Sequence, residues 1–161
     1  MQIELKNIKV STFMSQETHC FEASLYIDGK RIGKVWNEGH GGPDGFTGDE
    51  LAYSQANEWV KDNHAGQTIN GLHIPTDLED VCAQRLADHL MAKDLRRSMK
   101  SRVLFYRPEE KQIMELRWKG VRKIDERHIE VAQRDNPSAV ILNTLPFDEA
   151  FAAYQQYAAV A

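Results

Sequence analysis

The sequence predicts an α+β fold in a single globular domain that spans residues 1–161. Three observations support this prediction. Apolar and polar residues alternate in the first third of the chain, two helical patterns follow, and the last third mixes short strands with short helices. This order favours α+β over a doubly wound parallel sheet. With 161 residues, 42% of them hydrophobic, the chain is long enough to bury one core.

The first predicted element is an antiparallel meander of three strands. Apolar residues between Ile3 and Val10 indicate a first strand with a phase slip near Asn7. Alternation from Phe21 to Ile27 indicates a second strand, and Asp28-Gly29 supplies the two positive φ values of a type I′ turn. A third strand therefore follows directly after this turn.

The turn also predicts the register of the hairpin. Counting outward from Asp28-Gly29, Phe21 lies opposite Trp36 on an apolar face, and Cys20 lies opposite Asn37 on the other face. Because Asn37 is only three residues from His40, this register predicts that Cys20 and His40 converge in space.

Two helices are predicted in the middle of the chain, each introduced by a capping box. Thr47-Gly48-Asp49-Glu50 starts the first, which runs to about Asn63, and Thr76-Asp77-Leu78-Glu79 starts the second. The residues between them, 64–75, are expected to form a loop. Basic residues gather at the end of the second helix, where they suit the helix dipole.

The last third predicts a hairpin, a helix, a strand and a final helix. Pro146 suits the first turn of that last helix, where a missing N–H costs nothing. The predicted elements are strands over 103–106 and 113–118 with a turn at 108–111, a helix over 123–132, a strand over 139–142 and a helix after Pro146.

A glycine-dense loop from Trp36 to Phe46 is the strongest candidate site. Four glycines in seven residues allow positive φ and close approach to another surface, and they leave His40 unshielded. An imidazole near its ordinary pKa can act as base, acid, metal ligand or hydrogen-bond donor. The predicted contact residues of this loop are Trp36, Asn37, His40, Gly41, Gly42 and Phe46.

Catalysis at this loop is the alternative from a different class. A small enzyme or nucleotide-binding protein would use His40, with Cys20 as a thiol partner, or the backbone N–H groups of the loop. Zinc would need His19, Cys20 and His40, but adjacent strand residues point to opposite faces, which excludes one of the first two. We therefore predict no metal, no cofactor and no assigned catalytic residue.

The charge distribution suggests a second candidate surface. Residues 93–123 carry eleven Lys and Arg against four Asp and Glu, a net +7, although the whole chain has a net charge of −4. A DNA mimic would need a far more negative surface. Nucleic-acid binding is thus a second alternative, through a cluster that consists of Arg96, Arg97, Lys100 and Arg102.

The sequence also predicts the cellular location of the protein. No stretch approaches the roughly 18 apolar residues of a membrane span, so we expect no membrane partner. The start, Met1 to Lys6, lacks a basic lead and an apolar signal core, which predicts a cytoplasmic protein. Cys20 and Cys82 are too few for a disulfide framework and are expected to be reduced.

Several segments resemble a family of small phage and prophage proteins without assigned function. The segments that carry the resemblance are Phe13 to Gly29, Gly39-His40-Gly41-Gly42, Ser101 to Phe105 and Leu142 to Ala150. The resemblance implies a bacterial host and an origin on a mobile element. By analogy, the expected function is non-catalytic binding to a host macromolecule, in the first place a host protein, with inhibition of an antiviral defence as one form. The sequence is also compatible with self-association as a homo-oligomer.

Overall fold

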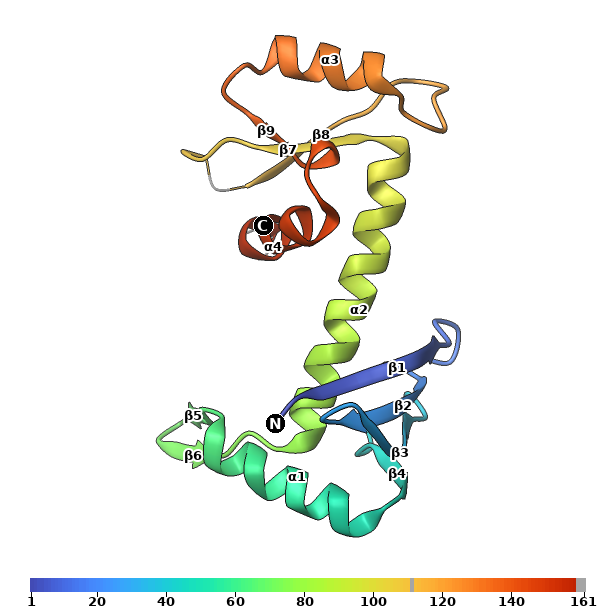
Figure 1. Ribbon diagram of the computed structural model, residues 1–161, viewed down its shortest axis with the longest axis vertical. Coiled ribbons are helices and arrows are strands. Elements are labelled where there is room, and N and C mark those ends of the chain that lie inside the picture. Colours follow the sequence, from blue (N-terminus) through green and yellow to red (C-terminus); the bar gives the residue numbers. More distant parts are fainter. Residues whose placement is uncertain (111, 159–161) are drawn as a thin grey trace. The chain divides into compact units, whose positions relative to one another are not determined.

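A computed structural model describes residues 1–110 and 112–158. Its contacts divide the chain into two compact units, Met1–Asp88 and His89–Ala161, and each is described by itself (Figure 1). The fold is α+β, as predicted, with antiparallel sheets and four helices among the described residues. The single domain stays a prediction.

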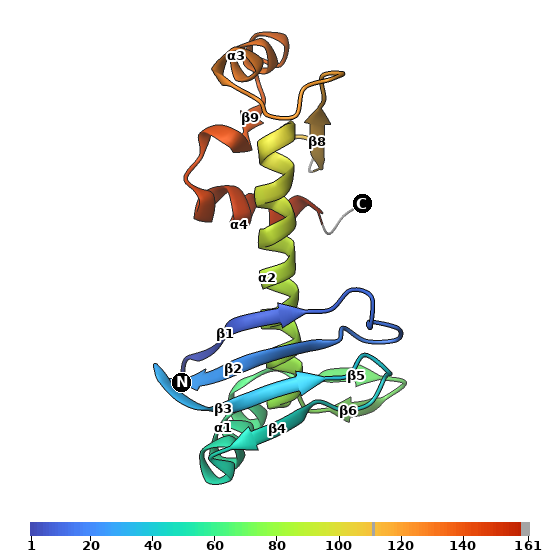
Figure 2. The same cartoon turned by 90° about the vertical axis from the view of Figure 1, so that its right-hand side faces the viewer.

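The N-terminal unit contains a four-stranded antiparallel sheet in the order β1-β2-β3-β4 (Figure 2). A helix, a short hairpin and the first part of a second helix follow it. The elements are β1 (Ile3–Val10), β2 (Phe21–Ile27), β3 (Lys30–Asn37), β4 (Gly45–Gly48), α1 (Glu50–Asn63), β5 (Gln67–Ile69), β6 (Leu72–Ile74) and α2 (Leu78–Ser101), of which residues up to Asp88 belong to this unit.

Two predicted features of the meander are confirmed. Asn7 has a φ of 54° and lies where the β1–β2 register shifts, which is the predicted phase slip. Asp28 and Gly29 have φ values of 47° and 80°, as a type I′ turn requires.

The predicted register of the hairpin is correct only next to the turn. Tyr26 pairs with Arg31, as expected, but Leu25 pairs with Gly33, so Ile32 is an extra residue in a β-bulge. The bulge shifts every later pair of β2 and β3 by one position.

This shift corrects the faces on which the later residues lie. Phe21 pairs with Asn37, not with Trp36, and Cys20 therefore does not lie opposite Asn37. Val35 and Asn37 are buried beside the core, whereas Trp36 is only half-buried, on the open face of the sheet. The bulge thus turns Asn37 inward and Trp36 outward.

The start of the first helix also differs from the prediction. Thr47, the predicted start of the capping box, belongs instead to the edge strand β4, which also includes the predicted end of the glycine loop. The N-cap of α1 is Asp49, whose side chain accepts a hydrogen bond from the Ala52 N–H.

The second helix begins one residue later than predicted. Asp77 accepts a hydrogen bond from the Asp80 N–H, and Asp80 accepts one from the Asp77 N–H, so these two aspartates form a capping box. Thr76 instead donates its hydroxyl to the Ala65 carbonyl.

The predicted loop between the helices contains the hairpin β5–β6. Asn70 and Gly71 have φ values of 51° and 81° and form its turn. Ile69 pairs with Leu72, and Ile74 pairs with Gln67, which places the three apolar side chains on one face of the hairpin. All three are exposed.

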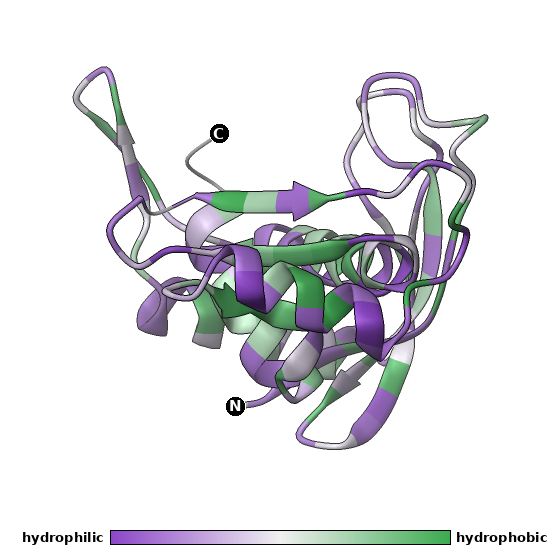
Figure 3. Ribbon diagram, turned by 90° about the horizontal axis from the view of Figure 1, so that it is seen from above, coloured by the Kyte–Doolittle hydropathy of each residue, from purple (hydrophilic) through white to green (hydrophobic). Residues whose placement is uncertain are grey.

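The core of the N-terminal unit lies between the inner face of the sheet, α1 and the start of α2. Its buried members are Ile3, Phe21, Ala23, Leu25, Ile32, Val35, Ala56, Val60, Leu78, Val81, Cys82 and Leu86. Green and purple residues alternate along the helices and strands in Figure 3, as expected of elements with one buried face.

The C-terminal unit has the predicted hairpin, helix, strand and helix. Lys111, in the predicted turn, lies outside the described residues. After the end of α2 come β7 (Val103–Tyr106), β8 (Ile113–Leu116), α3 (Glu126–Asp135), β9 (Val140–Ile141), the 3-10 turn Leu142–Thr144 and α4 (Phe147–Ala158).

The sheet of this unit, in the order β8-β7-β9, is covered on both faces. Val103 and Phe105 pack with Ala132 of α3, and Leu104 packs with Leu95 of α2 and Ala150 of α4. Figure 1 accordingly shows the sheet between α3 and α4. The uninterrupted apolar run of β7 follows from this burial on two sides.

Candidate functional site

The glycine loop after β3 is organised by the buried side chain of Asn37. Its amide nitrogen donates to the Gly42 carbonyl and to Asp44 Oδ1, both at 2.9 Å. Its amide oxygen accepts from Thr18 Oγ1 at 2.7 Å and from the Gly39 N–H at 2.8 Å. These four bonds use the full capacity of the amide, so Asn37 is a structural support of the loop.

A second loop, residues 11–20, is fastened to the glycine loop. The Gly39 carbonyl accepts hydrogen bonds from the N–H groups of Gln16 and Glu17 at 2.9 and 3.1 Å. Thr18 bridges the loops again, because its hydroxyl also accepts from the Gly41 N–H at 3.3 Å. We call residues 11–20 and 38–44 the paired loops.

Two glycines of the paired loops have distinct structural reasons, close backbone approach at Gly39 and positive φ at both Gly39 and Gly41. A Cβ at position 39 would lie 2.5 Å from the Met14 carbonyl oxygen, and one at position 41 would collide with the Glu17 carboxylate. Both glycines also have positive φ, 88° and 82°. Packing within the chain and backbone conformation therefore account for Gly39 and Gly41, whereas a Cβ at Gly42 would meet nothing within 4 Å.

Two large apolar side chains of the paired loops are exposed to solvent. Phe13 is 98% exposed and Met14 is 50% exposed. Their backbone is nevertheless fixed, because the Met14 N–H donates to the Ser11 carbonyl and Ser15 links the Ser11 carbonyl to the Cys20 N–H. An exposed aromatic side chain on a held backbone is a typical anchor of a protein interface.

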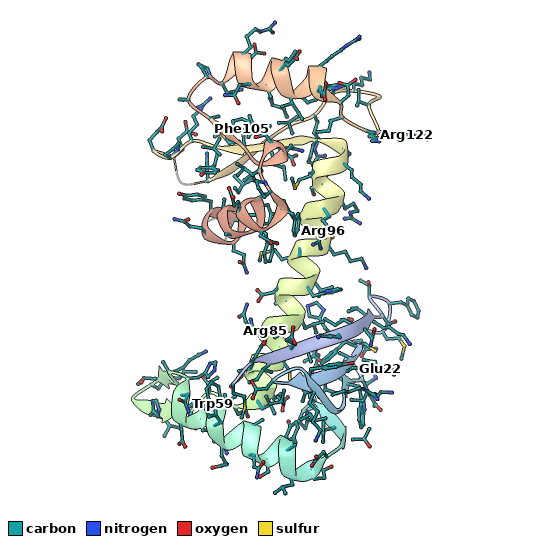
Figure 4. The ribbon with its side chains drawn as sticks, viewed as in Figure 1. Glu22, Trp59, Arg85, Arg96, Phe105 and Arg122 are labelled. Atoms are coloured by element: carbon teal, nitrogen blue, oxygen red, sulfur yellow. The ribbon has the colours of Figure 1, made fainter. Side chains whose placement is uncertain are left out.

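An open groove of about 750 Å³ lies beside these residues on the outer face of the sheet. Trp36 forms part of its wall and lies flat over Gly45, where a Cβ would collide with the indole ring. The Lys34 ammonium lies 6.0 Å from the indole and 2.6 Å from the Glu22 carboxylate (Glu22 is labelled in Figure 4). The groove is lined by Lys9, Val10, Ser11, Met14, Cys20, Phe21, Glu22, Lys34, Trp36, Asn37, Glu38, His40 and Thr47.

His40 and Cys20 both line this groove, although the strand register that was expected to bring them together is not the one observed. His40 is exposed, and its Nδ1 lies 3.3 Å from Gln16 Oε1. The structure records no hydrogen bond between the Cys20 thiol and the His40 ring among the described residues. Such a bond to an adjacent base is one of the ways in which a thiol nucleophile is activated. His19 lines a different pocket, together with Asp44 and Glu79.

Phe46 does not reach the surface that carries Trp36 and His40. It pairs with Val35 on the inner side of the sheet, and its ring packs against Tyr53 of α1 at a centroid distance of 4.4 Å. The predicted grouping of these three side chains is therefore wrong.

Asp44 fastens the glycine loop to α2. Its N–H donates to Glu79 Oε1 at 2.9 Å, and its carboxylate accepts from Asn37. Burial raises the pKa of Asp44, the Asn37 hydrogen bond opposes this shift, and the nearby Glu79 and Asp77 carboxylates add to it. This crowding of acids makes the loop unsuited to a phosphate.

The structure offers no metal centre within residues 1–110 and 112–158, where no three His, Cys, Asp or Glu side chains are placed to hold an ion. No helix in this part of the chain is long and apolar enough to cross a membrane.

The predicted basic cluster of the C-terminal unit is largely engaged in internal contacts. The Arg96 guanidinium lies 3.7 Å from the centroid of the Phe147 ring, and Arg102 pairs with Glu115. Arg97 lies 3.7 Å from Asp94, whereas Lys100 is exposed. The position of Arg96 on α2 is seen in Figure 4. Arg97 stays 85% exposed despite its contact with Asp94, so internal contacts restrain Arg96 and Arg102 more than Arg97 and Lys100.

Sequence reasoning missed Phe13 and Met14 as site residues. The signal was present, because they form an apolar pair within the polar run from Ser11 to Thr18. No protein-family model, no curated protein and no solved structure matches this chain.

Proposed function

We propose that this chain is a non-catalytic binding protein whose paired loops dock onto a host protein. The observation that carries the proposal is Phe13, an aromatic side chain that is 98% exposed on a hydrogen-bonded loop. Phe13 does not stand alone, because Met14 beside it is 50% exposed and lines the neighbouring groove, and a contiguous exposed apolar patch marks a protein-binding site.

The surroundings of Phe13 support a protein partner. Met14 lies next to it, and the groove with Trp36 and His40 is adjacent. Aromatic residues and methionine are enriched at protein interfaces, where a few anchors supply most of the affinity. Because the loops are already ordered, little conformational entropy is lost on binding.

The host setting rests on the resemblance of the N-terminal segments and the Leu142–Ala150 segment to small phage and prophage proteins. In that setting the partner is a protein in the bacterial cytosol, and inhibition of a defence component is the form of binding we favour. The enzyme alternative has no geometric support from the residues of the groove.

Exchange of one exposed side chain tests the proposal. Wild type, Phe13→Ser and Leu51→Ser are used to capture proteins from bacterial lysate, and the captured protein is then purified and titrated. Leu51 is a matched control, because it is an apolar residue that is 70% exposed on α1. We expect Phe13→Ser to weaken binding at least about tenfold, roughly 1.4 kcal/mol, and Leu51→Ser to leave it unchanged. Equal binding by all three proteins, or no captured partner, would refute the proposal.

A further inference from the structure

The C-terminal unit differs from the N-terminal unit in charge. Residues 89–161 carry thirteen Lys and Arg against ten Asp and Glu, a net +3, whereas residues 1–88 carry seven against fourteen, a net −7. An excess of positive charge is the first requirement of a surface that binds phosphates.

Ion pairs and ring contacts separate the cations of this unit into two groups. Arg96, Arg97, Arg102, Arg107, Arg117 and Arg134 are engaged by Phe147, Asp94, Glu115, Glu110 or Asp135. Among the described residues, the exposed cations without such a contact are Lys93, Lys100, Lys119, Arg122, Lys123 and Arg127.

Four of these six cations come together at the end of α2. The Ile124 N–H donates to the Lys100 carbonyl at 3.0 Å, so the loop 118–124 folds back onto this helix end. Gly120, with a φ of 81°, allows the turn. We call Lys100, Lys119, Arg122 and Lys123 the basic turn; Arg122 is seen at the outer edge of this loop in Figure 4.

The basic turn is held in place from both sides. Trp118 and Ile124, at the two ends of the loop, pack against the core of Val103 and Phe105. Asn143 fixes the helix end, because its amide nitrogen donates to the carbonyls of Met99 and Arg102 at 2.9 and 3.1 Å. The cations therefore project from an ordered backbone.

The chemistry of the exposed residues favours nucleic acid over protein as the ligand. The exposed large apolar residues among those described are Met1, Phe13, Met14, Leu51, Ile69, Leu72 and Ile74, all of the N-terminal unit. The basic turn thus offers charge without the apolar anchors that protein interfaces use. We propose that the basic turn binds the phosphate backbone of a nucleic acid, without reading its sequence.

The salt dependence of binding to labelled random-sequence oligonucleotides tests this proposal. The protein is titrated against single-stranded DNA, duplex DNA and RNA, with poly-glutamate as a non-nucleic polyanion. With four phosphate contacts, log K is expected to fall with log salt at a slope of about −3, and Kd near physiological salt is expected at about 10⁻⁴ to 10⁻⁶ M. The preferred oligonucleotide identifies the form of nucleic acid.

A charge-matched pair of variants locates the site. Arg122→Ala/Lys123→Ala should reduce the slope to about −1.5 and weaken binding at 100 mM salt at least about tenfold. Arg107→Ala/Arg134→Ala removes the same charge from arginines that pair with Glu110 and Asp135 outside the basic turn, and should change Kd less than about twofold. Both variants are checked for folding by circular dichroism. Absence of binding at 50 mM salt, equal affinity for poly-glutamate, or equal loss in both variants would overturn the proposal. None of these outcomes bears on the binding of a protein through Phe13.

Discussion

The Asn37 side chain holds the paired loops together, because its amide group makes four hydrogen bonds to them. Asn37→Ala leaves the Gly39 N–H, the Gly42 carbonyl and the Asp44 carboxylate without this partner. We expect the free energy of unfolding to fall by about 2–3 kcal/mol, measured by urea denaturation.

Asn63→Ala is the control for this prediction. Asn63 is exposed at the end of α1 and makes a single local bond to the Trp59 carbonyl, so its loss should cost less than about 0.5 kcal/mol. Trp59 is labelled in Figure 4. Equal costs for the two variants would contradict the supporting role of Asn37.

The two cysteines should react very differently. Cys20 is half-buried beside the groove, whereas Cys82 is buried, and burial raises its pKa from 9.0 to about 12. Since the thiolate is the reactive form, maleimide at pH 7 should label Cys20 alone in the folded protein and both cysteines in urea. Mass spectrometry after Cys20→Ser should then show no label without urea, and rapid labelling of Cys82 would contradict its burial.

We expect the hairpin β5–β6 to contribute little to the stability of the protein, because its apolar side chains are exposed. Ile69 and Leu72 are already exposed, so Ile69→Ser/Leu72→Ser should change the free energy of unfolding by less than about 0.5 kcal/mol. The contrasting variant Leu78→Ala, at a fully buried position, should cost about 2–5 kcal/mol in the same denaturation experiment. A large loss from the hairpin variant would mean that these side chains are covered in solution.

Elements with local signals could be predicted from the sequence. Asp28-Gly29 predicts one turn, the change of pattern at Asn7 predicts the slip in register, and Pro146 predicts the start of α4. Asn70-Gly71 carries the same kind of turn signal as Asp28-Gly29, although only a loop is predicted there. The missing strand β4 has no local signal, because two of its four residues are glycine and its place depends on pairing with β3.

The site could be predicted only where it depends on residue type. His40 and Trp36 were found because a glycine-rich loop after a hairpin is unusual, and both line the groove. The inward turn of Asn37 could not be foreseen, since it follows from one extra residue at Ile32. Likewise, nothing near Arg96 in the sequence indicates that Phe147 lies under its guanidinium.

Across the whole chain, the two proposed binding chemistries are carried by different units. The exposed apolar residues named above belong to the unit of net charge −7, and the basic turn belongs to the unit of net charge +3. Binding through Phe13 should therefore be nearly independent of salt between 50 and 200 mM, measured as Kd for the captured protein. A steep salt dependence in that assay would instead indicate that charged contacts dominate.

The stability of the N-terminal unit should decrease in alkaline solution. Burial raises the pKa of Tyr53 from 10.0 to about 12, and the Cys82 thiol shifts in the same direction for the same reason. The unfolded chain releases these protons at lower pH than the folded chain. The stability that the two neutral groups contribute is therefore complete below pH 9 and is lost as the pH rises towards about 12.

Tyr53→Phe isolates one of these groups, because it removes the hydroxyl and keeps the ring that packs against Phe46. At pH 7 the variant should match wild type within about 0.5 kcal/mol. Between pH 9 and pH 11 its free energy of unfolding, measured by urea denaturation, should fall less steeply than that of wild type, because one titrating group fewer is linked to unfolding. An unchanged slope would mean that the Tyr53 hydroxyl titrates equally in the folded and unfolded chains and is not buried as the structure places it.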